Sequence, residues 1–325
     1  MKDFCIIGSG IAGSTVANLL AKEYSVEIFD KARGPGGRSS NRRYKKNLSF
    51  DHGLQYFSPK SIKFKKFILS LKRKKVLKEW PGKHLDFTFE KKKKSIKYIG
   101  SKGNNDICKN LIKKIKVNYK SQVTNIRFNS NYWTITLNHK NKVFFKNLIL
   151  TCPFPQLKIL ASKYIKKKIS NFKVNMTPNI TVIVAYKNCK KLPINSIKFN
   201  DEIISWGVQE NTKDRFNTNQ ILWTVQCTES FSRKTINLLK YNKNKYQLMI
   251  LKRFEKLLGY QTKKIVFKGV HGWKYAYNKS TTSAEYIWNK KSNFGVCGDW
   301  FVGPKAEHAW LSARNLYYKI KKKPS

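Results

Sequence analysis

A glycine-rich turn between a strand and a helix is the feature that most restricts the fold of this chain. Residues 4–30 read FCIIGSGIAGSTVANLLAKEYSVEIFD, in which Gly8, Gly10 and Gly13 have the spacing G-x-G-x-x-G. An apolar run precedes the turn, helical apolar spacing follows it, and the β-rich run VEIF ends at Asp30. This order predicts a strand, a helix and a second strand of one βαβ unit.

Each of these residues has a mechanical role in holding a dinucleotide. Gly8 permits the tight turn, Gly10 lets a pyrophosphate approach the backbone, and Gly13 lets the helix pack close to the strand. The helix N-terminus supplies N–H donors and partial positive charge, and Asp30 can accept hydrogen bonds from a ribose hydroxyl. We therefore expect a Rossmann-type domain, because a turn without a ligand would leave Asp30 unexplained.

The segment after Asp30 separates NAD from FAD. An NAD-binding domain would continue with a short helix and strand, whereas this chain continues KARGPGGRSSNRRYKKNLSFDHGLQYF. Gly36-Gly37 followed by Arg38 resembles the glycine-doublet motif of FAD-dependent flavoproteins of the amine-oxidase type, in which it lies against the pyrophosphate and the flavin. DHGLQYF (51–57) resembles the segment beside their flavin ring. FGVCGDWF (294–301) resembles their C-terminal FAD motif, in which the acid, here Asp299, bonds the ribityl chain.

More narrowly, the chain resembles the bacterial renalase-like oxidoreductases. The matching segments occur in order along the chain: FDKARGPGGRSS, DHGLQYF, LILTCPFPQ, GWKYA, CGDWFVG and EHAWLSA. The resemblance implies an α/β fold with a Rossmann-type FAD-binding domain of the glutathione-reductase and p-hydroxybenzoate-hydroxylase kind. We expect that domain over residues 1–60, 95–160 and 266–325, and a discontinuous mixed-sheet substrate domain over 61–94 and 161–265.

Non-covalent FAD is the cofactor that the resemblance implies. A helix N-terminus near the flavin would stabilise the negative charge of the reduced ring, and we expect the N–H groups of Ala309, Trp310 and Leu311 to serve there. The full set of expected cofactor contacts is Gly8, Ser9, Gly10, Ile11, Ala12, Gly13, Asp30, Lys31, Arg33, Gly36, Gly37, Arg38, Gln55, Tyr56, Phe57, Val123, Gly298, Asp299, Ala309, Trp310 and Leu311.

The expected reaction is direct hydride transfer from a small planar substrate. Only one G-x-G-x-x-G is present and no C-x-x-C dithiol, so neither a second dinucleotide domain nor a disulfide relay is indicated. The resemblance implies dihydro isomers of NAD(P)H as substrate, with oxygen or a quinone reoxidising the flavin. Aromatic residues could enclose the pyridine ring, with Lys274 near the phosphates; they are Tyr56, Phe57, Trp273, Tyr275 and Trp300.

Two other functions fit parts of the sequence. The same fold could oxidise an amine, a porphyrinogen or a carotenoid, although an amine oxidase would favour an acidic or aromatic-caged entrance. A formal net charge of +49 also allows a basic nucleic-acid-binding protein built on a flavoprotein scaffold. Because 57 lysines and only 10 arginines are spread through almost every segment, composition alone can explain this charge.

The remaining signals indicate a reducing compartment and no metal. Six dispersed cysteines and five histidines form no metal-spaced cluster. The N-terminus enters a strand directly, without an apolar signal region, and no apolar run is long enough to cross a membrane. We therefore expect a cytoplasmic protein. Outside the first βαβ unit, we expect a helix over 61–80, a β-meander over 121–153, a long helix over 235–258 and a terminal helix over 307–321.

Overall fold

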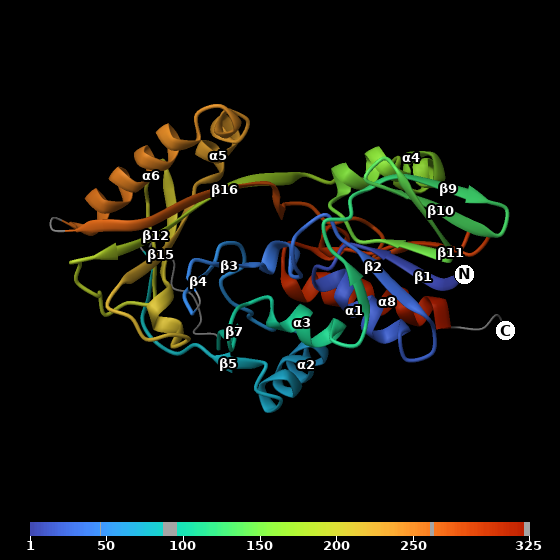
Figure 1. The fold of residues 1–325 in the computed structure, drawn as a ribbon, viewed down its shortest axis with the longest axis horizontal. Coiled ribbons are helices and arrows are strands. Elements are labelled where there is room, and N and C mark those ends of the chain that lie inside the picture. The colour runs from blue at the N-terminus through green and yellow to red at the C-terminus, as the bar shows by residue number, and fades with distance from the viewer. Residues whose placement is uncertain (46, 87–95, 261–262, 322–325) are drawn as a thin grey trace.

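Two β-sheets and the helices that cover them make up the described chain (Figure 1). The computed structural model describes residues 1–45, 47–86, 96–260 and 263–321. The fold is α/β, with a Rossmann-like domain and a separate mixed sheet, as the sequence predicted. The N-terminus and the last described helix, residues 306–321, lie on the same side of the molecule, beside the first sheet (Figure 1).

The first sheet contains the predicted βαβ unit. Its parallel centre is buried because the strands are continuous apolar runs with neighbours on both sides. Its strand order is β17 (Ile287–Asn289), β18 (Phe294–Val296), β11 (Asn141–Leu150), β1 (Lys2–Ile7), β2 (Val26–Phe29) and β8 (Lys116–Asn118). The hairpin β9 (Val123–Asn129) and β10 (Tyr132–Leu137) pairs antiparallel with β11, which confirms the predicted meander.

Helices cover one face of this sheet, and the hairpin and further helices cover the other. Apolar residues of β1 pack on one face against α1 (Ile11–Leu20), α2 (Ile62–Arg73), α3 (Asp106–Ile112) and α8 (Ala306–Lys321). On the opposite face lie α4 (Phe154–Ile169) and α7 (Asp299–Val302). The buried residues of α4 include Phe154, Leu157, Ala161 and Ile165, a helical spacing that gives the helix one apolar side.

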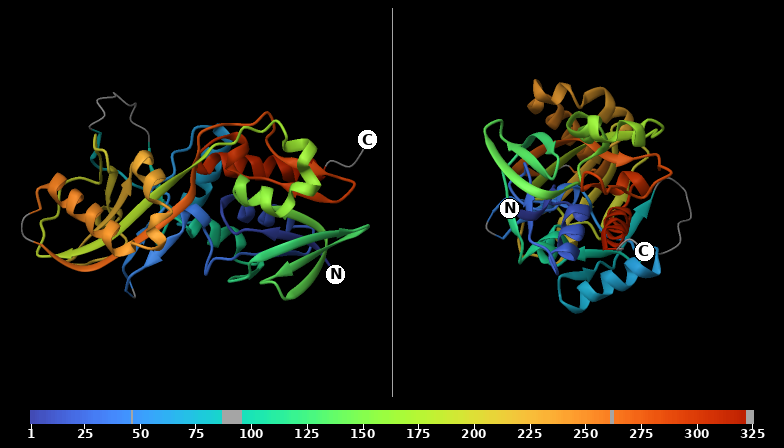
Figure 2. Two further views of the ribbon diagram at one scale, coloured as in Figure 1. Left: turned by 90° about the horizontal axis from the view of Figure 1, so that it is seen from above. Right: turned by 90° about the vertical axis from the view of Figure 1, so that its right-hand side faces the viewer.

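The second sheet is antiparallel except at one edge. Its order is β16 (Lys264–Asn278), β12 (Met176–Lys187), β15 (Ile221–Cys227), β14 (Ile204–Gln209), β13 (Ser196–Lys198) and β6 (His84–Asp86), and β13 pairs parallel with β6. Figure 2 shows β12 and β16 extending from this sheet toward the first. One face packs against α6 (Lys243–Leu258), and Phe231 of α5 (Glu229–Thr235) packs against the same apolar cluster.

Shorter elements join the two sheets. They are the pairs β3 (Asn41–Arg43) with β4 (Ser49–Asp51) and β5 (Leu77–Glu79) with β7 (Tyr98–Gly100), and the short helix η1 (Gly37–Ser39). Two other short helices belong to the second sheet: η2 (Glu210–Lys213) follows β14, and η3 (Leu238–Lys240) precedes α6. Phe50 of β4 packs on Ile183, Ala185 and Leu222, which lie on the face of the second sheet opposite α6. The segment after the glycine doublet therefore contacts both sheets.

The structure corrects two expected helices. The helix expected over 61–80 ends at Arg73, and β5 follows it. The helix expected over 235–258 is divided into η3 and α6, with Asn242 as the cap residue before α6. No helix among the described residues is both long and apolar enough to cross a bilayer.

The expected domain boundaries do not coincide with the boundary between the sheets. Residues 266–278 belong to β16 and pair with β12 in the second sheet, and Arg38 of the glycine-doublet motif donates to the Ala276 carbonyl oxygen near the end of that strand. Residues 62–73 form α2, whose apolar side packs in the core beneath α8 rather than with the second sheet. Residues 87–94 of the expected substrate domain lie outside the described residues.

Candidate active site

A cavity of about 3680 Å³ is lined by residues from both sheets and from the connections between them. Its lining includes the glycine turn after β1, and also residues of the edge strand β6 and of its neighbour β13. Residues 52–57 and the end of β16 line it as well. A cavity of this volume has room for an elongated ligand and for a second small molecule beside it.

The glycine turn is packed as its spacing predicts. A Cβ atom on Gly13 would lie 1.9 Å from the carbonyl oxygen of Gly8, so only glycine lets α1 approach β1 this closely. Gly10 forms an isolated bridge to Gly36, and the Gly36 N–H donates to the Ser9 carbonyl oxygen at 3.0 Å. The doublet and the turn, far apart in sequence, thus form one continuous backbone surface on the cavity.

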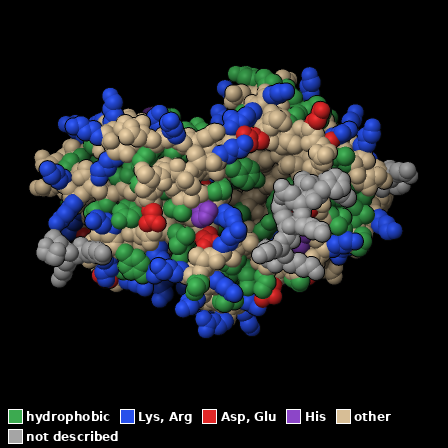
Figure 3. Space-filling model, turned by 180° about the vertical axis from the view of Figure 1, so that it is seen from behind, with side chains coloured by type: hydrophobic (Ala, Val, Ile, Leu, Met, Phe, Trp, Pro, Cys, Tyr) green, Lys and Arg blue, Asp and Glu red, His purple; other side chains and the backbone are tan. Residues whose placement is uncertain are grey.

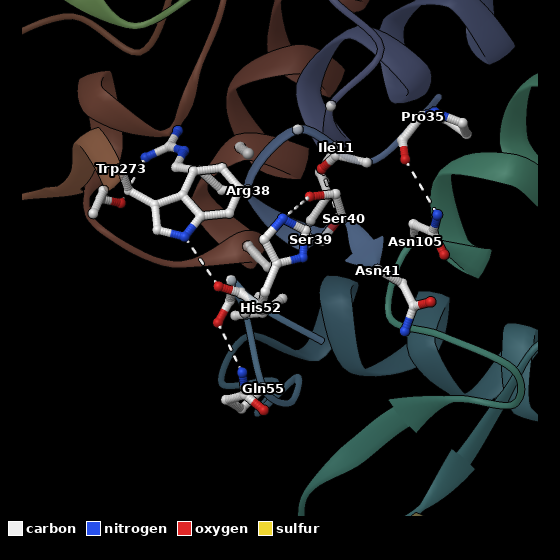
Figure 4. Close-up of a pocket in the computed structure, with 18 of the residues that line it drawn as sticks. Ile11, Pro35, Arg38, Ser39, Ser40, Asn41, His52, Gln55, Asn105 and Trp273 are labelled. Carbon is white, nitrogen blue, oxygen red and sulfur yellow. Dashed lines mark hydrogen bonds between the residues drawn. The ribbon is translucent and has the colours of Figure 1, made fainter. Parts of the chain in front are cut away.

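The doublet depends on a backbone conformation that favours glycine. Gly36 has φ of +127°, and a Cβ atom there would lie 2.8 Å from Asn105 Cβ. Asn105 Nδ2 donates to the Pro35 carbonyl oxygen at 3.3 Å, which holds the loop against α3 (Figure 4).

Asp30 is positioned on the cavity wall by local donors. The backbone N–H and hydroxyl of Ser9 donate to Asp30 Oδ2 at 2.7 and 2.5 Å, and the Ala32 N–H donates to Oδ1 at 2.8 Å. Ser9 itself is fully buried. Its contribution is therefore to orient the carboxylate, while Asp30 lines the cavity.

An ion pair joins the two ends of the chain. Arg38 Nη2 lies 2.5 Å from Asp299 Oδ1, and Arg38 Nη1 donates to the Ala276 carbonyl oxygen at 3.1 Å. Asp299 is 5% exposed. The guanidinium thus connects the glycine doublet, the C-terminal motif and the end of β16 in one place. Sequence reasoning placed both residues at the site but did not predict that they pair.

An alternating run on β16 supplies an aromatic side of the cavity. His271, Trp273, Tyr275 and Tyr277 are two residues apart, and all four line the cavity. The Trp273 indole N–H donates to the His52 carbonyl oxygen at 3.0 Å, and Figure 4 shows the two rings beside Arg38. The sequence prediction missed His271, although the alternation H-x-W-x-Y-x-Y was visible.

The two histidines of this region are held neutral. Burial, followed by the nearby His271 and Arg42, lowers the pKa of His52 to about 4. Burial also lowers the pKa of His271, and Arg42 adds to the effect. The rings of His271 and Trp273 are 4.2 Å apart between centroids. Neutral imidazoles beside an indole form a surface suited to a flat, uncharged ring.

A fully buried ion cluster lies behind the segment 51–57. Lys213 Nζ is 2.8 Å from Asp51 Oδ2 and 2.9 Å from Glu210 Oε2, and it donates to Gln55 Oε1 at 3.0 Å. Arg215 Nη1 is 2.5 Å from Asp51 Oδ2. Burial alone would raise the pKa of Asp51, but the charges of Arg215 and Lys213 outweigh it and hold that pKa below its usual range.

Comparison with known proteins agrees with this geometry. Residues 6–69 match a family model for an NAD(P)-binding Rossmann-like domain. A crystal structure named as a candidate protoporphyrinogen oxidase from Exiguobacterium sp. 255-15 is similar with a TM-score of 0.76 at 10% identity, covering 98% of each chain. Putrescine oxidase with bound putrescine is similar with a TM-score of 0.66 at 10% identity, covering 99% of each chain.

This chain has the amine-oxidase fold. An oxidoreductase from Methanosarcina mazei is also similar, with a TM-score of 0.64 at 12% identity over 97% of this chain and 100% of that one. The shared fold extends over nearly the whole length, so both sheets, and not the Rossmann-like unit alone, belong to it.

Most predicted site residues line the cavity of this amine-oxidase fold. Those on its wall are Gly8, Gly10, Ile11, Ala12, Asp30, Lys31, Arg33, Gly36, Gly37, Arg38, Gln55, Tyr56, Phe57, Val123, Trp273, Tyr275, Gly298, Asp299 and Ala309. Lys274 lines it as well. Five predicted residues do not: Ser9, Gly13, Trp300, Trp310 and Leu311. Ser9 and Gly13 help to form the glycine turn without facing the cavity. The roles predicted for Trp300, Trp310 and Leu311 differ from where the structure places these residues.

Trp300 is a core residue. Its side chain is fully buried on the face of the first sheet covered by α4, with its ring 3.8 Å from that of Phe301 and 5.0 Å from that of Phe154. Its indole N–H donates to the Cys152 carbonyl oxygen at 3.2 Å. Trp300 therefore packs in the core and does not line the cavity in this structure.

Trp310 and Leu311 lie too far into α8 to offer free N–H groups. The helix begins at Ala306, and only the N–H groups of its first turn lack intrahelical acceptors. The Ala309 N–H already donates to the Lys305 carbonyl oxygen at 3.3 Å. The Trp310 ring packs against Phe67 instead, with centroids 5.1 Å apart. Any helix-end contribution to the cavity comes from residues 306 and 307.

The residues of the cavity fit FAD. The contact between Gly10 and the doublet is a cradle in which a Cβ atom on Gly37 would lie 3.3 Å from Gly10 Cα, so the space beside the turn exists because these positions lack side chains. The lining of the same cavity also includes Asp30 and Val123, and it includes Asp299 and Trp273. Both ends of the chain therefore meet one elongated space. No group of three or more His, Cys, Asp or Glu among the described residues is placed to hold a metal.

Proposed function

We propose that this protein is an FAD-dependent oxidoreductase that oxidises dihydro isomers of NAD(P)H to NAD(P)+, with oxygen or a quinone as the electron acceptor. The observation that carries the proposal is the single cavity that joins the glycine turn and Asp30 to the aromatic residues of β16. When bound, FAD supplies the two-electron acceptor for the substrate hydride.

The residues divide into a cofactor side and a substrate side. The backbone of residues 8–13 and the Asp30 carboxylate would hold the adenosine and pyrophosphate, and the Arg38–Asp299 pair would position the middle of the cofactor. Tyr56, Trp273 and Tyr275 would orient a planar pyridine ring against the flavin. Neutral His52 and His271 exclude water from that ring without adding a positive charge beside it.

The charges on the cavity wall favour an anionic substrate over an amine. Basic side chains outnumber acidic ones among the described lining residues, and the acids are engaged. Asp299 pairs with Arg38, Asp86 pairs with Lys198 at 2.8 Å, and Glu307 accepts the N–H groups of residues 60 and 61. An ammonium substrate would meet like charge, whereas phosphate groups would be attracted.

Anaerobic mixing of the purified protein with candidate reductants tests the proposal. We expect a yellow protein whose visible flavin absorbance is lost on adding dihydro isomers of NAD(P)H and is restored by air. Ordinary NADH and a diamine such as putrescine serve as comparison substrates. Bleaching by the diamine and none by the isomers would overturn the substrate assignment, and a colourless protein that takes up no added FAD would overturn the cofactor.

A further inference from the structure

The edge of the second sheet presents a set of side chains to the far end of the cavity. In the parallel pair of β6 and β13, His84 is opposite Ser196 and Asp86 is opposite Lys198. On the other side of β13, Trp206 of β14 is opposite Lys198. Because side chains alternate along a strand, these five residues share one face of the sheet. All of them line the cavity.

Aromatic rings cover part of this face. The Trp80 ring lies 4.5 Å from that of His84, and the Tyr56 ring lies 5.8 Å from that of Trp206 between centroids. Trp80 is buried, while Tyr56 and Trp206 are half-buried. The exposed parts of Tyr56 and Trp206 give a flat ligand an aromatic surface on which to stack.

Two lysines share the same space. Lys97 Nζ lies 5.5 Å from the centroid of the Tyr56 ring, and Lys198 Nζ lies 2.8 Å from Asp86 Oδ2. Burial lowers the pKa of Lys97, and repulsion from Lys198 lowers it further. Lys83 also lines this part of the cavity. Among the described residues, Asp86 pairs with Lys198, and the ammonium groups of Lys97 and Lys198 repel each other, so a bound anion would reduce this repulsion.

A histidine at the centre of the group has an unused hydrogen-bonding atom. His84 Nδ1 lies 2.8 Å from Ser196 Oγ. Its Nε2 is buried and has no hydrogen-bond partner among the described residues. Buried polar atoms normally have a hydrogen-bond partner, so a ligand oxygen near His84 could accept a hydrogen bond from Nε2. We call Trp80, His84, Lys97, Ser196, Lys198 and Trp206 the distal wall.

We propose that the distal wall binds the phosphate groups and the second base of a dinucleotide substrate, the half that does not react. This inference rests on the proposed function, in which Tyr56 helps to orient the pyridine ring; the Tyr56 ring also lies next to that of Trp206 in the distal wall. Lysines supply charge for the phosphates and the aromatic pair supplies a stacking surface for the base. The phosphates of FAD itself would be held elsewhere, by the glycine turn of residues 8–13.

Calorimetric titration of the FAD-loaded protein with ADP tests the site without catalysis. Loading matters because apoprotein could take ADP into the adenosine end of the FAD site. We expect one ADP per chain, with adenosine and inorganic pyrophosphate each binding more weakly. Lys198→Met and Trp206→Leu should each weaken ADP binding by about tenfold, a loss typical of one charged or aromatic contact. Lys187→Met, at an exposed position on β12 away from the cavity, should leave it unchanged.

Two outcomes would overturn the site: absence of ADP binding to the loaded protein, or equal binding by the wild type and both wall variants. Lys198→Met also leaves Asp86 without its lysine, so Trp206→Leu provides an independent measurement, and unchanged thermal midpoints confirm that both variants fold. Pyrophosphate binding as tightly as ADP, and unaffected by Trp206→Leu, would overturn the assignment of a base to the wall.

Kinetics separate this inference from the proposed function. Each wall variant should raise KM about tenfold for a dihydro isomer of NAD and leave kcat nearly unchanged. The matching dihydro isomer of nicotinamide riboside lacks both the phosphate groups and the second base and should show no change. If ADP binds as expected but neither isomer reduces the flavin, the proposed function fails and the site stands. If both isomers react with equal KM and ADP does not bind, the site fails and the proposed function stands.

Discussion

Gly36 is a residue of the glycine doublet at which a single methyl group should be costly. A Cβ atom there would meet Asn105 and Ser40 within 3.0 Å, and φ of +127° is unfavourable for any L side chain. We predict that Gly36→Ala lowers the free energy of unfolding by about 1–2 kcal/mol and that the purified protein retains less FAD. Chemical denaturation and the ratio of visible to ultraviolet absorbance measure the two effects.

Gly34 provides the matched control. It lies in the same loop, but a Cβ atom there would have no neighbour within 4 Å and its φ is not in the left-handed region. Gly34→Ala should therefore change neither stability nor FAD content. Equal effects of the two substitutions would show that the loop as a whole, and not the backbone of the doublet, determines cofactor retention.

His52 should make stability depend on pH in the acid range. Its pKa in the fold is about 4, below the usual 6.5, so the unfolded chain binds the proton more tightly than the folded one. Its contribution is therefore complete above about pH 6.5 and is lost as pH falls toward 4. We predict that the wild type loses about 2–3 kcal/mol more than His52→Gln over this range. Urea unfolding at both ends of the range measures the difference.

The other acid-sensitive groups serve as an internal control in that experiment. Burial, and then Lys97, lowers the pKa of His84 to about 4 as well. Because His84 is present in both proteins, its contribution cancels in the comparison. Parallel curves for the wild type and His52→Gln would contradict the assignment of a neutral, buried imidazole at position 52.

At the scale of elements, the ion cluster attaches the segment 51–57 to η2 of the second sheet. Lys213 lies at the end of η2 and contacts Asp51 of β4 and Gln55. All three side chains are buried, and Gln55 and the following Tyr56 line the cavity. The cluster therefore fixes the position of a cavity-lining segment relative to a sheet with which it shares no strand pairing.

Lys213→Met should be strongly destabilising. It would leave Asp51 paired only with Arg215 and would leave Glu210 buried without its cation, and burial already raises the pKa of Glu210. We expect the free energy of unfolding to fall by about 3–5 kcal/mol. Lys72→Met removes a lysine from an exposed pair with Glu79 and should cost less than about 1 kcal/mol. A similar cost for both would show that the buried cluster contributes no more than a surface pair.

At the scale of the whole molecule, positive charge is general rather than local. On the face drawn in Figure 3, outside the grey residues, Lys and Arg side chains are widely spread instead of forming a stripe. A stripe would indicate nucleic acid, whereas a uniform field attracts any anion. This distribution favours the compositional explanation of the net charge of +49 and still predicts faster capture of phosphate-bearing substrates.

We predict that kcat/KM for a dihydro isomer of NADP falls at least threefold, roughly, as ionic strength rises from about 0.01 M to about 0.15 M. The corresponding isomer of nicotinamide riboside carries no phosphate and should show little dependence. Stopped-flow reduction of the flavin measures both. Equal salt dependence for the two substrates would show that the positive field of the protein does not guide the substrate. In a separate measurement, retention of DNA by the yellow protein at physiological salt would favour the nucleic-acid alternative.

The local elements of the cofactor side followed from the sequence alone. The strand, turn, helix and acid of residues 2–30 have short-range causes: apolar runs, glycine at fixed offsets and helical spacing. The alternation in β16 and the meander over β9 to β11 are of the same kind. Such patterns can be read because each depends on neighbours only a few positions away.

Contacts between distant segments were decided by tertiary packing. The pairing of Arg38 with Asp299, the cluster around Lys213 and the distal wall each join residues more than a hundred positions apart. The burial of Trp300 and Trp310 likewise depends on which side of α7 and α8 faces the sheet. No local spacing encodes these contacts, since the energy of a buried charge or ring depends on everything packed around it. The sequence determined where a dinucleotide could be held, and only the packing of the two sheets determined which side chains surround the space beside it.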